Sequence, residues 1–214
     1  MLNWFSNPRR QLLWSVGSLI VSMSVLVPLL TRVMGPLPGF LTCFLVYWLG
    51  FCLPITLYFT KRLRSCGAYA LDVGSSRWIP WCVALQIVVI AISSFALLED
   101  EVSVLAVVSA LLFAAVNGVL EEFAWRGAFF EQGKGDPWFQ AFGVGLFAAW
   151  HVPLVFAYRI TYPGGPLALL GGTFAMGAFW AFLVARTNRI GWPIIGHVSM
   201  NAIAFIGFFV SNGL

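Results

Sequence analysis

The sequence predicts an all-α protein: a polytopic bundle of about seven (six to eight) transmembrane helices. Of its 214 residues, 60% are hydrophobic and only 9% are charged, and its mean hydropathy is +0.90. Its apolar runs are about 20 residues long, which is the length that crosses a bilayer as a helix. These runs lack the alternation of barrel strands, and an open sheet cannot span lipid. The composition therefore excludes a soluble domain.

Seven apolar windows give the expected spans, and clusters of glycine and proline separate several of them. The first window follows a basic N-terminus and has no small-residue cleavage site, so we expect an uncleaved span rather than a signal peptide. The expected spans are 12–34, 40–60, 79–98, 102–130, 138–158, 167–185 and 190–209.

The positions of the basic residues predict the orientation of the bundle. One side of the expected spans carries Arg9, Arg10, Lys61, Arg62, Arg64, Arg77, Lys134, Arg186 and Arg189. The other side carries Arg32, Arg159 and the acidic run at 99–101. The positive-inside rule then places the N-terminus in the cytoplasm and the C-terminus outside, unless an eighth short segment returns the C-terminus. Basic loops beside spans give no phosphate-binding face, so we expect no nucleic-acid partner.

Small residues recur at steps of about four residues in the sixth span, at Gly171, Ala175, Gly177 and Ala181. Small side chains allow neighbouring transmembrane helices to approach closely. We expect this stripe to serve packing inside the bundle more than a dimer interface, and the sequence leaves the oligomeric state open.

Six polar side chains interrupt the apolar spans of the second half of the chain. A charge at membrane depth costs several kcal/mol unless it is paired or hydrated, so such a group is a functional-site hypothesis. The six are Glu121, Glu122, Arg126, His151, His197 and Asn201. They form the patterns E-E-x-x-x-R, F-x-x-x-H and H-x-x-x-N, and we expect them to build one site.

The first pattern, E-E-x-x-x-R, predicts different roles for its two glutamates. On a helix, Glu122 and Arg126 are i,i+4 neighbours that can pair, and Glu121 points about 100° away. One carboxylate is then held by the guanidinium, and the other is available as a general base. The alternative is a solvated helix end at the cytoplasmic surface, where both glutamates and the arginine are ordinary polar residues.

The depth of each group in its span tests whether they can meet. With 1.5 Å rise per residue, the glutamates lie about 16 Å from the turn at Gly133, and His151 lies about 20 Å beyond it. A helical hairpin would bring these groups together. His197 lies only about 9 Å into its span and is expected to be shallower. His197 and Asn201 share one helix face, so their side chains could together donate to an oxyanion. The alternative to a catalytic role, for these two residues and for His151, is ordinary hydrogen bonding between helices.

Taken in order over the last four spans, the three patterns resemble the CPBP family of intramembrane proteases (CAAX protease and bacteriocin-processing, or Abi). The resemblance covers roughly residues 102–210, about half of the chain. It implies a division into N-terminal transmembrane helices at 1–101, the variable part, and a catalytic helical core at 102–214. All motif positions are filled, which implies an active member of the family.

The resemblance also implies the role of each residue. Glu121 and His151 would activate the attacking water, and His197 and Asn201 would stabilise the oxyanion. Glu122 and Arg126 would hold the glutamate helix in register. A glutamic protease of this type requires no metal or other cofactor. The residues alone leave a divalent metal open, since glutamate and histidine ligate zinc, although the pattern H-E-x-x-H is absent.

The leading hypothesis is an intramembrane endopeptidase that cleaves a membrane-associated peptide or protein substrate near the cytoplasmic leaflet, in a bacterial inner membrane. A proton-coupled transporter is the second hypothesis, because buried acids and histidines also mark proton relays. A non-catalytic scaffold that binds a partner enzyme is the third. The lipid bilayer is the common partner in all three.

Overall fold

The computed structural model describes residues 7–61, 67, 69–74, 76–98 and 101–214, and these residues contain helices and no strand. Two helices are extended by a π-helical turn (η2 and η3), and one is followed by a 3₁₀ helix (η4). In order, the elements are α1 (Pro8–Val33), α2 (Pro36–Tyr47), η2 (Trp48–Cys52), α3 (Leu53–Phe59), α5 (Ile79–Ala96), α6 (Val104–Glu121), η3 (Glu122–Gly127), α7 (Ala128–Gln132), α8 (Pro137–Trp150), η4 (Val152–Phe156), α9 (Gly165–Thr187) and α10 (Gly191–Ser211).

The prediction of an all-α bundle with seven spans is confirmed. Seven helical segments of the described residues are long and apolar enough to cross a membrane. The second, fourth and fifth segments each consist of two or three consecutive elements. The seven are Pro8–Val33, Pro36–Phe59, Ile79–Ala96, Val104–Gln132, Pro137–Phe156, Gly165–Thr187 and Gly191–Ser211. The expected ends differ by a few residues. The first span begins earlier than expected because the Asn7 side chain accepts hydrogen bonds from the backbone N–H groups of Arg9 and Arg10.

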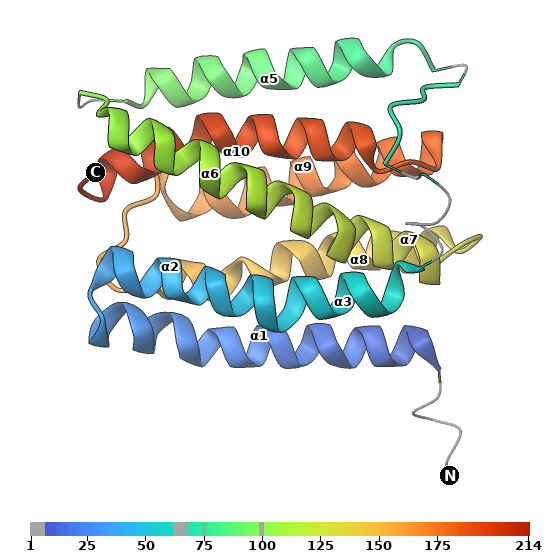
Figure 1. Ribbon diagram of the computed structural model, residues 1–214, viewed down its shortest axis with the longest axis horizontal. Coiled ribbons are helices and arrows are strands. Elements are labelled where there is room, and N and C mark those ends of the chain that lie inside the picture. Colours follow the sequence, from blue (N-terminus) through green and yellow to red (C-terminus); the bar gives the residue numbers. More distant parts are fainter. Residues whose placement is uncertain (1–6, 62–66, 68, 75, 99–100) are drawn as a thin grey trace.

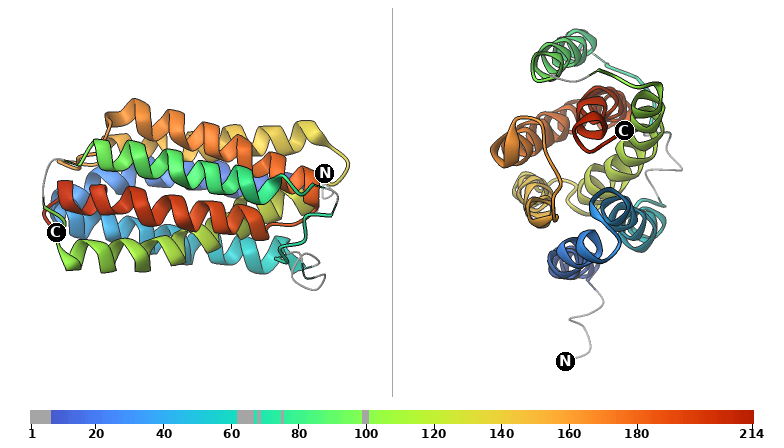
Figure 2. Two further views of the ribbon diagram at one scale, coloured as in Figure 1. Left: turned by 90° about the horizontal axis from the view of Figure 1, so that it is seen from above. Right: turned by 90° about the vertical axis from the view of Figure 1, so that its left-hand side faces the viewer.

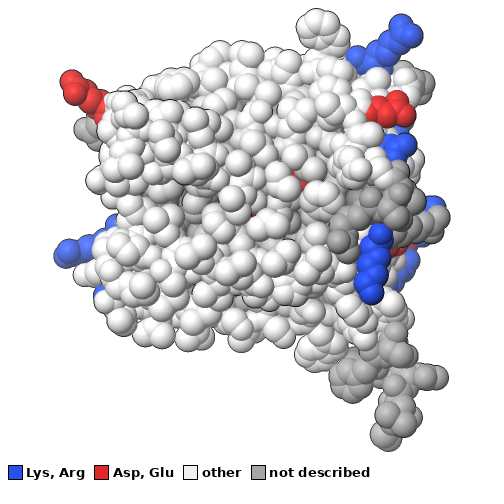
Figure 3. Space-filling model, viewed as in Figure 1, with Lys and Arg blue, Asp and Glu red and all other residues white. Residues whose placement is uncertain are grey.

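The helices lie roughly parallel and antiparallel to one another, so the bundle has two ends (Figures 1 and 2). We call the end where α1 begins and α9 ends the basic end, and the end where α10 terminates the C-terminal end. Lysines and arginines gather mainly at the basic end, and the middle of the visible face is almost free of charge (Figure 3). Arg62, Arg64, Glu99 and Asp100, which entered the orientation argument, lie outside the described residues.

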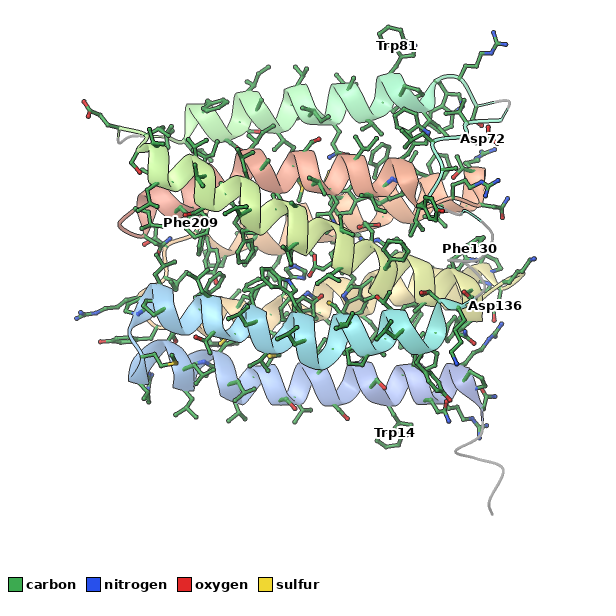
Figure 4. The ribbon with its side chains drawn as sticks, in the orientation of Figure 1. Trp14, Asp72, Trp81, Phe130, Asp136 and Phe209 are labelled. Atoms are coloured by element: carbon green, nitrogen blue, oxygen red, sulfur yellow. The ribbon has the colours of Figure 1, made fainter. Side chains whose placement is uncertain are left out.

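The outer surface of the bundle suits lipid. Trp14 on α1 and Trp81 on α5 project from opposite faces, and they are 60% and 77% exposed (Figure 4). Large apolar side chains are exposed along the first six spans as well. Without a bilayer such a surface would associate non-specifically. The protein is therefore an integral membrane protein.

The backbones of α6 and α10 cross at close range. A Cβ atom added at Gly118 would lie 2.7 Å from Cγ2 of Val198 and 2.9 Å from its backbone nitrogen. Only glycine allows the two backbones to approach this closely. The crossing lies one helical turn from Glu121 and Glu122, and it fixes the distance between the glutamates and α10.

The small residues of the sixth span, from Gly171 to Ala181, allow close packing of α9 only in its second half. Gly177 is buried, and a Cβ atom there would lie 3.1 Å from an Arg126 nitrogen. Gly171 has no described atom within 4 Å of its would-be Cβ, and Ala175 is exposed. The prediction of close approach was therefore wrong for the first half of α9, because that half stands away from its neighbours.

Candidate functional site

The two glutamates lie at the join between α6 and the π-helical turn η3, near the middle of the bundle. Glu121 is 1% exposed and Glu122 is fully buried. A π-helical turn holds one extra residue and redirects the side chains that follow, and such turns are frequent at functional sites. A second π-helical turn, η2, packs against η3. The backbone is thus irregular on both sides of Glu121.

Glu121 is held by donors from two helices. Tyr47 Oη donates to Oε1 at 2.7 Å, and Asn117 Nδ2 donates to Oε2 at 3.1 Å. Each donor is itself fixed, because Trp125 Nε1 donates to Tyr47 Oη at 2.7 Å and Trp48 Nε1 donates to Asn117 Oδ1 at 2.8 Å. These contacts leave the Glu121 carboxylate with a fixed orientation, as a general base requires.

Glu122 faces a different set of groups, and the expected pair with Arg126 is present. Arg126 NH1 lies 3.2 Å from Glu122 Oε1, and the two side chains are 4% and 0% exposed. This contact does not have the geometry of a hydrogen bond, so the attraction between Arg126 and Glu122 is mainly that of opposite charges. The guanidinium also lies 3.9 Å from the ring centre of Phe147, which provides cation–π stabilisation.

His197 lies between the two glutamates. Its Nδ1 is 2.7 Å from Glu122 Oε1, and its Nε2 is 3.3 Å from Glu121 Oε2. The Trp180 indole stacks on the imidazole, with ring centres 4.1 Å apart and planes 21° apart. The imidazole of His197 and the guanidinium of Arg126 thus face two carboxylates in one buried cluster. Such pairing is what keeps charge inside a low-dielectric bundle.

The expectation that His197 is shallower than the glutamates was wrong, because the start of α10 is covered. The segment 69–71 packs on Gly191, where a Cβ atom would lie 2.4 Å from the Tyr69 carbonyl oxygen. Trp192 Nε1 donates to the Leu71 carbonyl at 3.2 Å. The helix therefore begins inside the bundle rather than at its surface, and six residues are enough to bring His197 level with Glu121.

His151 lies at the point where α8 ends. The α-helix stops at Trp150 because Pro153 lacks an N–H group and disfavours α conformation in the residue before it. His151 Nδ1 lies 2.8 Å from the Phe147 carbonyl, which can only accept, so this nitrogen carries the proton. In the neutral ring, Nε2 then has a free lone pair and can accept a proton.

One cavity of about 360 Å³ connects these groups: Glu121, His151, His197 and Asn201 all line it. Asn201 is 5% exposed, and its Nδ2 has no hydrogen-bond partner among the described residues. A buried amide donor without a partner is costly unless a ligand or water uses it. The structure thus brings a carboxylate, an imidazole whose Nε2 can accept, and a free donor to one cavity.

Of the six predicted residues, Glu122 and Arg126 do not line this cavity. They lie behind His197. Sequence reasoning missed four side chains that hold Glu121: Tyr47, Trp48, Asn117 and Trp125. Asn117 was detectable, because it stands four residues before Glu121 on one helix face. Nothing in the sequence links the two aromatic residues of the second span to Glu121.

A metal centre needs several ligating side chains close together. Among the described residues, no group of three or more histidine, cysteine, aspartate and glutamate side chains is placed to hold a metal ion. Glu121 instead accepts hydrogen bonds from Tyr47 and Asn117, and Glu122 Oε1 contacts His197 Nδ1 and the Arg126 guanidinium. The arrangement supports acid–base chemistry by side chains.

Comparison with known families agrees with the geometry. Residues 103–203 match the family model described as Type II CAAX prenyl endopeptidase Rce1-like. The matched region contains all six predicted site residues. No curated protein and no solved structure matches the chain.

Proposed function

The chain is a membrane protein whose residues 103–203 form a domain of the Rce1-like CAAX protease (CPBP) family, and we propose that this domain hydrolyses a peptide bond of a membrane-associated protein or peptide. Endopeptidase activity in a membrane is the general property of this family. The finer proposal is a glutamic-type mechanism carried out by side chains of the cavity. The observation that supports it best is the fixed Glu121 carboxylate beside a free Asn201 donor.

Water is activated first in the proposed mechanism. Glu121 removes a proton from a water molecule in the cavity, and the oxygen attacks the carbonyl carbon of the substrate. His151, with its free Nε2, is the second group that can hold this proton. The fixed orientation of Glu121 supports this role, because a base must be in place before the substrate arrives.

The tetrahedral intermediate carries a negative oxygen that needs donors. Asn201 Nδ2 is one donor, and its lack of a partner in the described residues supports this assignment. His197 Nε2 is the other, since its 3.3 Å contact with Glu121 is longer than an ordinary hydrogen bond. When the C–N bond breaks, the proton held by Glu121 or His151 passes to the leaving amine. Water is thus added across the peptide bond.

Glu122 and Arg126 support the site through His197. Glu122 holds the His197 ring through Nδ1, and Arg126 pairs with Glu122 at a depth where an unpaired charge would be costly. We assign them positioning roles.

The test uses the protein in vesicles of bacterial inner-membrane lipid, mixed with membrane proteins extracted from bacteria. New N-termini are labelled and identified by mass spectrometry. Wild-type protein should generate them, and Glu121→Gln and His151→Ala should not, although both should remain folded. Glu101→Gln is the matched control, because it makes the same chemical change at an exposed residue outside the helices.

Retained cleavage in both site variants would contradict the proposal. Proton flux into sealed vesicles without new N-termini would favour a transporter. We also propose that the protein resides in a bacterial inner membrane with its N-terminus in the cytoplasm, on the basis of the basic end and the positive-inside rule.

A further inference from the structure

The cavity that contains Glu121 extends from the site in one direction only. On α10 its lining residues run from His197 to Phe208, and on α9 they run from Ala168 to Trp180. Both stretches lie between the level of the glutamates and the C-terminal end. Residues 181–187 and 191–196, which lead to the basic end, contribute nothing to its wall.

The other residues that line the cavity also lie toward the C-terminal end. The last turns of α5 and the first turns of α2 line the cavity, and both lie at the C-terminal end (Figure 1). Tyr162 and Pro163, from the loop at that end, complete the wall. Glu121 and the two histidines therefore form the floor of a cavity that faces the C-terminal end.

Toward the basic end the floor is closed by a polar plug. Trp180 Nε1 donates to Gln86 Oε1 at 3.0 Å, and Gln86 Nε2 donates to the Gly196 carbonyl at 3.0 Å. A Cβ atom at Gly196 would lie 3.0 Å from both Gln86 Oε1 and Trp180 Nε1. These three residues belong to three different helices, so the plug leaves no room beside His197.

The halves of α5 and α9 that lie toward the C-terminal end flank one side of the cavity, and we call the part of the cavity between them the side opening. The buried residues of α5 all lie in its first half (Ile79, Val83, Gln86), and those of α9 all lie in its second half, from Gly177 on. Because the two helices run in opposite directions, both buried halves lie near the basic end. Viewed along the bundle, α5 stands at the rim, above α9 and α10 (Figure 2).

The opening has a lining suited to a peptide in lipid. Its walls are mostly apolar, with the hydroxyl groups of Ser93, Ser94 and Thr173 among them. Apolar walls accept the side chains of an extended segment, and sparse polar groups can bind its backbone. Among the described residues no lysine or arginine lines the cavity, so none of them offers a counter-charge to a negatively charged headgroup or peptide there.

We propose that the substrate reaches Glu121 from the non-cytoplasmic half of the bilayer, between α5 and α9. The substrate is an extended apolar segment of a membrane-anchored polypeptide, and its cleavage site lies on the side opposite the basic end. This inference rests on the proposed function, and its orientation rests on the positive-inside rule. It replaces the expectation of cleavage near the cytoplasmic leaflet.

The first test measures access without cleavage. In a background lacking the four native cysteines, Thr173→Cys places a thiol in the cavity, and Lys134→Cys and Ser211→Cys mark the two ends. A membrane-impermeant methanethiosulfonate is added to sealed vesicles of each orientation. The Thr173→Cys thiol should react from the side that labels Ser211→Cys, and this side should be the non-cytoplasmic one.

Reaction of Thr173→Cys from the side that labels Lys134→Cys, or from neither side, would overturn the proposed route. Labelling of Ser211→Cys from the cytoplasm would overturn the orientation. Because labelling requires no catalysis, these outcomes are separate from an absence of proteolysis, which would count against the proposed function alone.

A second test needs no cysteine background. Gly172 lines the opening and its neighbour Gly171 does not, and neither has a described atom within 4 Å of its would-be Cβ. Gly172→Leu should raise KM for an apolar peptide substrate at least tenfold, and Gly171→Leu should leave it within twofold. Equal effects of the two variants would contradict entry between α5 and α9.

Discussion

Glu122 and His197 are 75 residues apart in the sequence, and Glu122 Oε1 lies 2.7 Å from His197 Nδ1. The same oxygen lies 3.2 Å from Arg126 NH1. One buried carboxylate oxygen therefore contacts both the Arg126 guanidinium and the His197 imidazole. This contact joins η3 to α10, and both the stability of the bundle and the geometry of the site depend on it.

Removing the charge of Glu122 should destabilise the protein strongly. Glu122→Gln leaves the Arg126 guanidinium buried without the carboxylate that pairs with it, and breaking a buried ion pair in this way costs about 3–5 kcal/mol. Unfolding in detergent should show the loss, whereas Glu101→Gln should unfold as the wild type does. Equal stability of the two variants would show that the Glu122 cluster is hydrated and weak.

Tyr47→Phe should lower activity through the position of Glu121. The change removes the O–H group that donates to Glu121 and accepts from Trp125, at a cost of about 1–3 kcal/mol for the unsatisfied partners. We expect kcat to fall with little change in KM, because the carboxylate loses its fixed orientation. Tyr58→Phe, at an exposed position of α3, is the control. A KM effect alone would indicate that Tyr47 contacts substrate instead.

Asn201→Leu should separate catalysis from stability. Asn201 Nδ2 has no partner in the described part of the chain, so the resting protein loses little when it is replaced. An oxyanion donor, in contrast, contributes about 10²–10³ to kcat. The variant should therefore unfold close to wild type and cleave at least about a hundredfold more slowly. Slow cleavage that merely parallels a loss of stability would argue for a packing role.

The crossing of α6 and α10 should tolerate no side chain at Gly118. Gly118→Ala places a methyl group against the Val198 backbone, and overpacking of this kind costs about 1–3 kcal/mol. The shift should also separate the glutamates from His197 and reduce cleavage. Gly171→Ala, which meets no described atom within 4 Å, should change neither property. Identical behaviour of the two variants would contradict the close crossing.

Asp136 gives a pH dependence outside the membrane-spanning segments. The backbone N–H of Phe139 and the Arg9 guanidinium hold the pKa of this carboxyl below its ordinary value of 3.8. A lowered pKa in the folded state means that the contribution is present at neutral pH and is lost as pH falls through the folded pKa. Asp136→Asn should thus lower Tm at pH 7 and match wild type in strong acid. A difference that persists at every pH would contradict this linkage.

The number and approximate ends of the spans were predictable, because hydrocarbon thickness fixes helix length and polar loops mark the turns. The position of His197 was not. Counting residues from a helix start assumes that the start lies at the surface, and the segment 69–71 covers Gly191. Likewise, the stripe from Gly171 to Ala181 predicted close packing along its whole length, although the first half of α9 stands apart.

The polar residues of the second half of the chain were predictable for a related reason: charge in an apolar span is conspicuous. The groups that orient Glu121 were harder to find. Tyr47 and Trp125 are ordinary members of aromatic spans, and only the three-dimensional structure shows that their polar atoms meet at Glu121. The direction of the cavity also depends on how α5 and α9 pack, which no local pattern encodes.

The central claim is that Glu121 activates water for peptide hydrolysis. The most direct measurement is the single-turnover rate of cleavage of one identified substrate by wild type and Glu121→Gln, with both proteins matched in Tm. General-base catalysis contributes about 10²–10⁴ to such a rate, so the variant should be slower by at least about a hundredfold. A folded Glu121→Gln protein that cleaves within threefold of the wild-type rate would contradict the account.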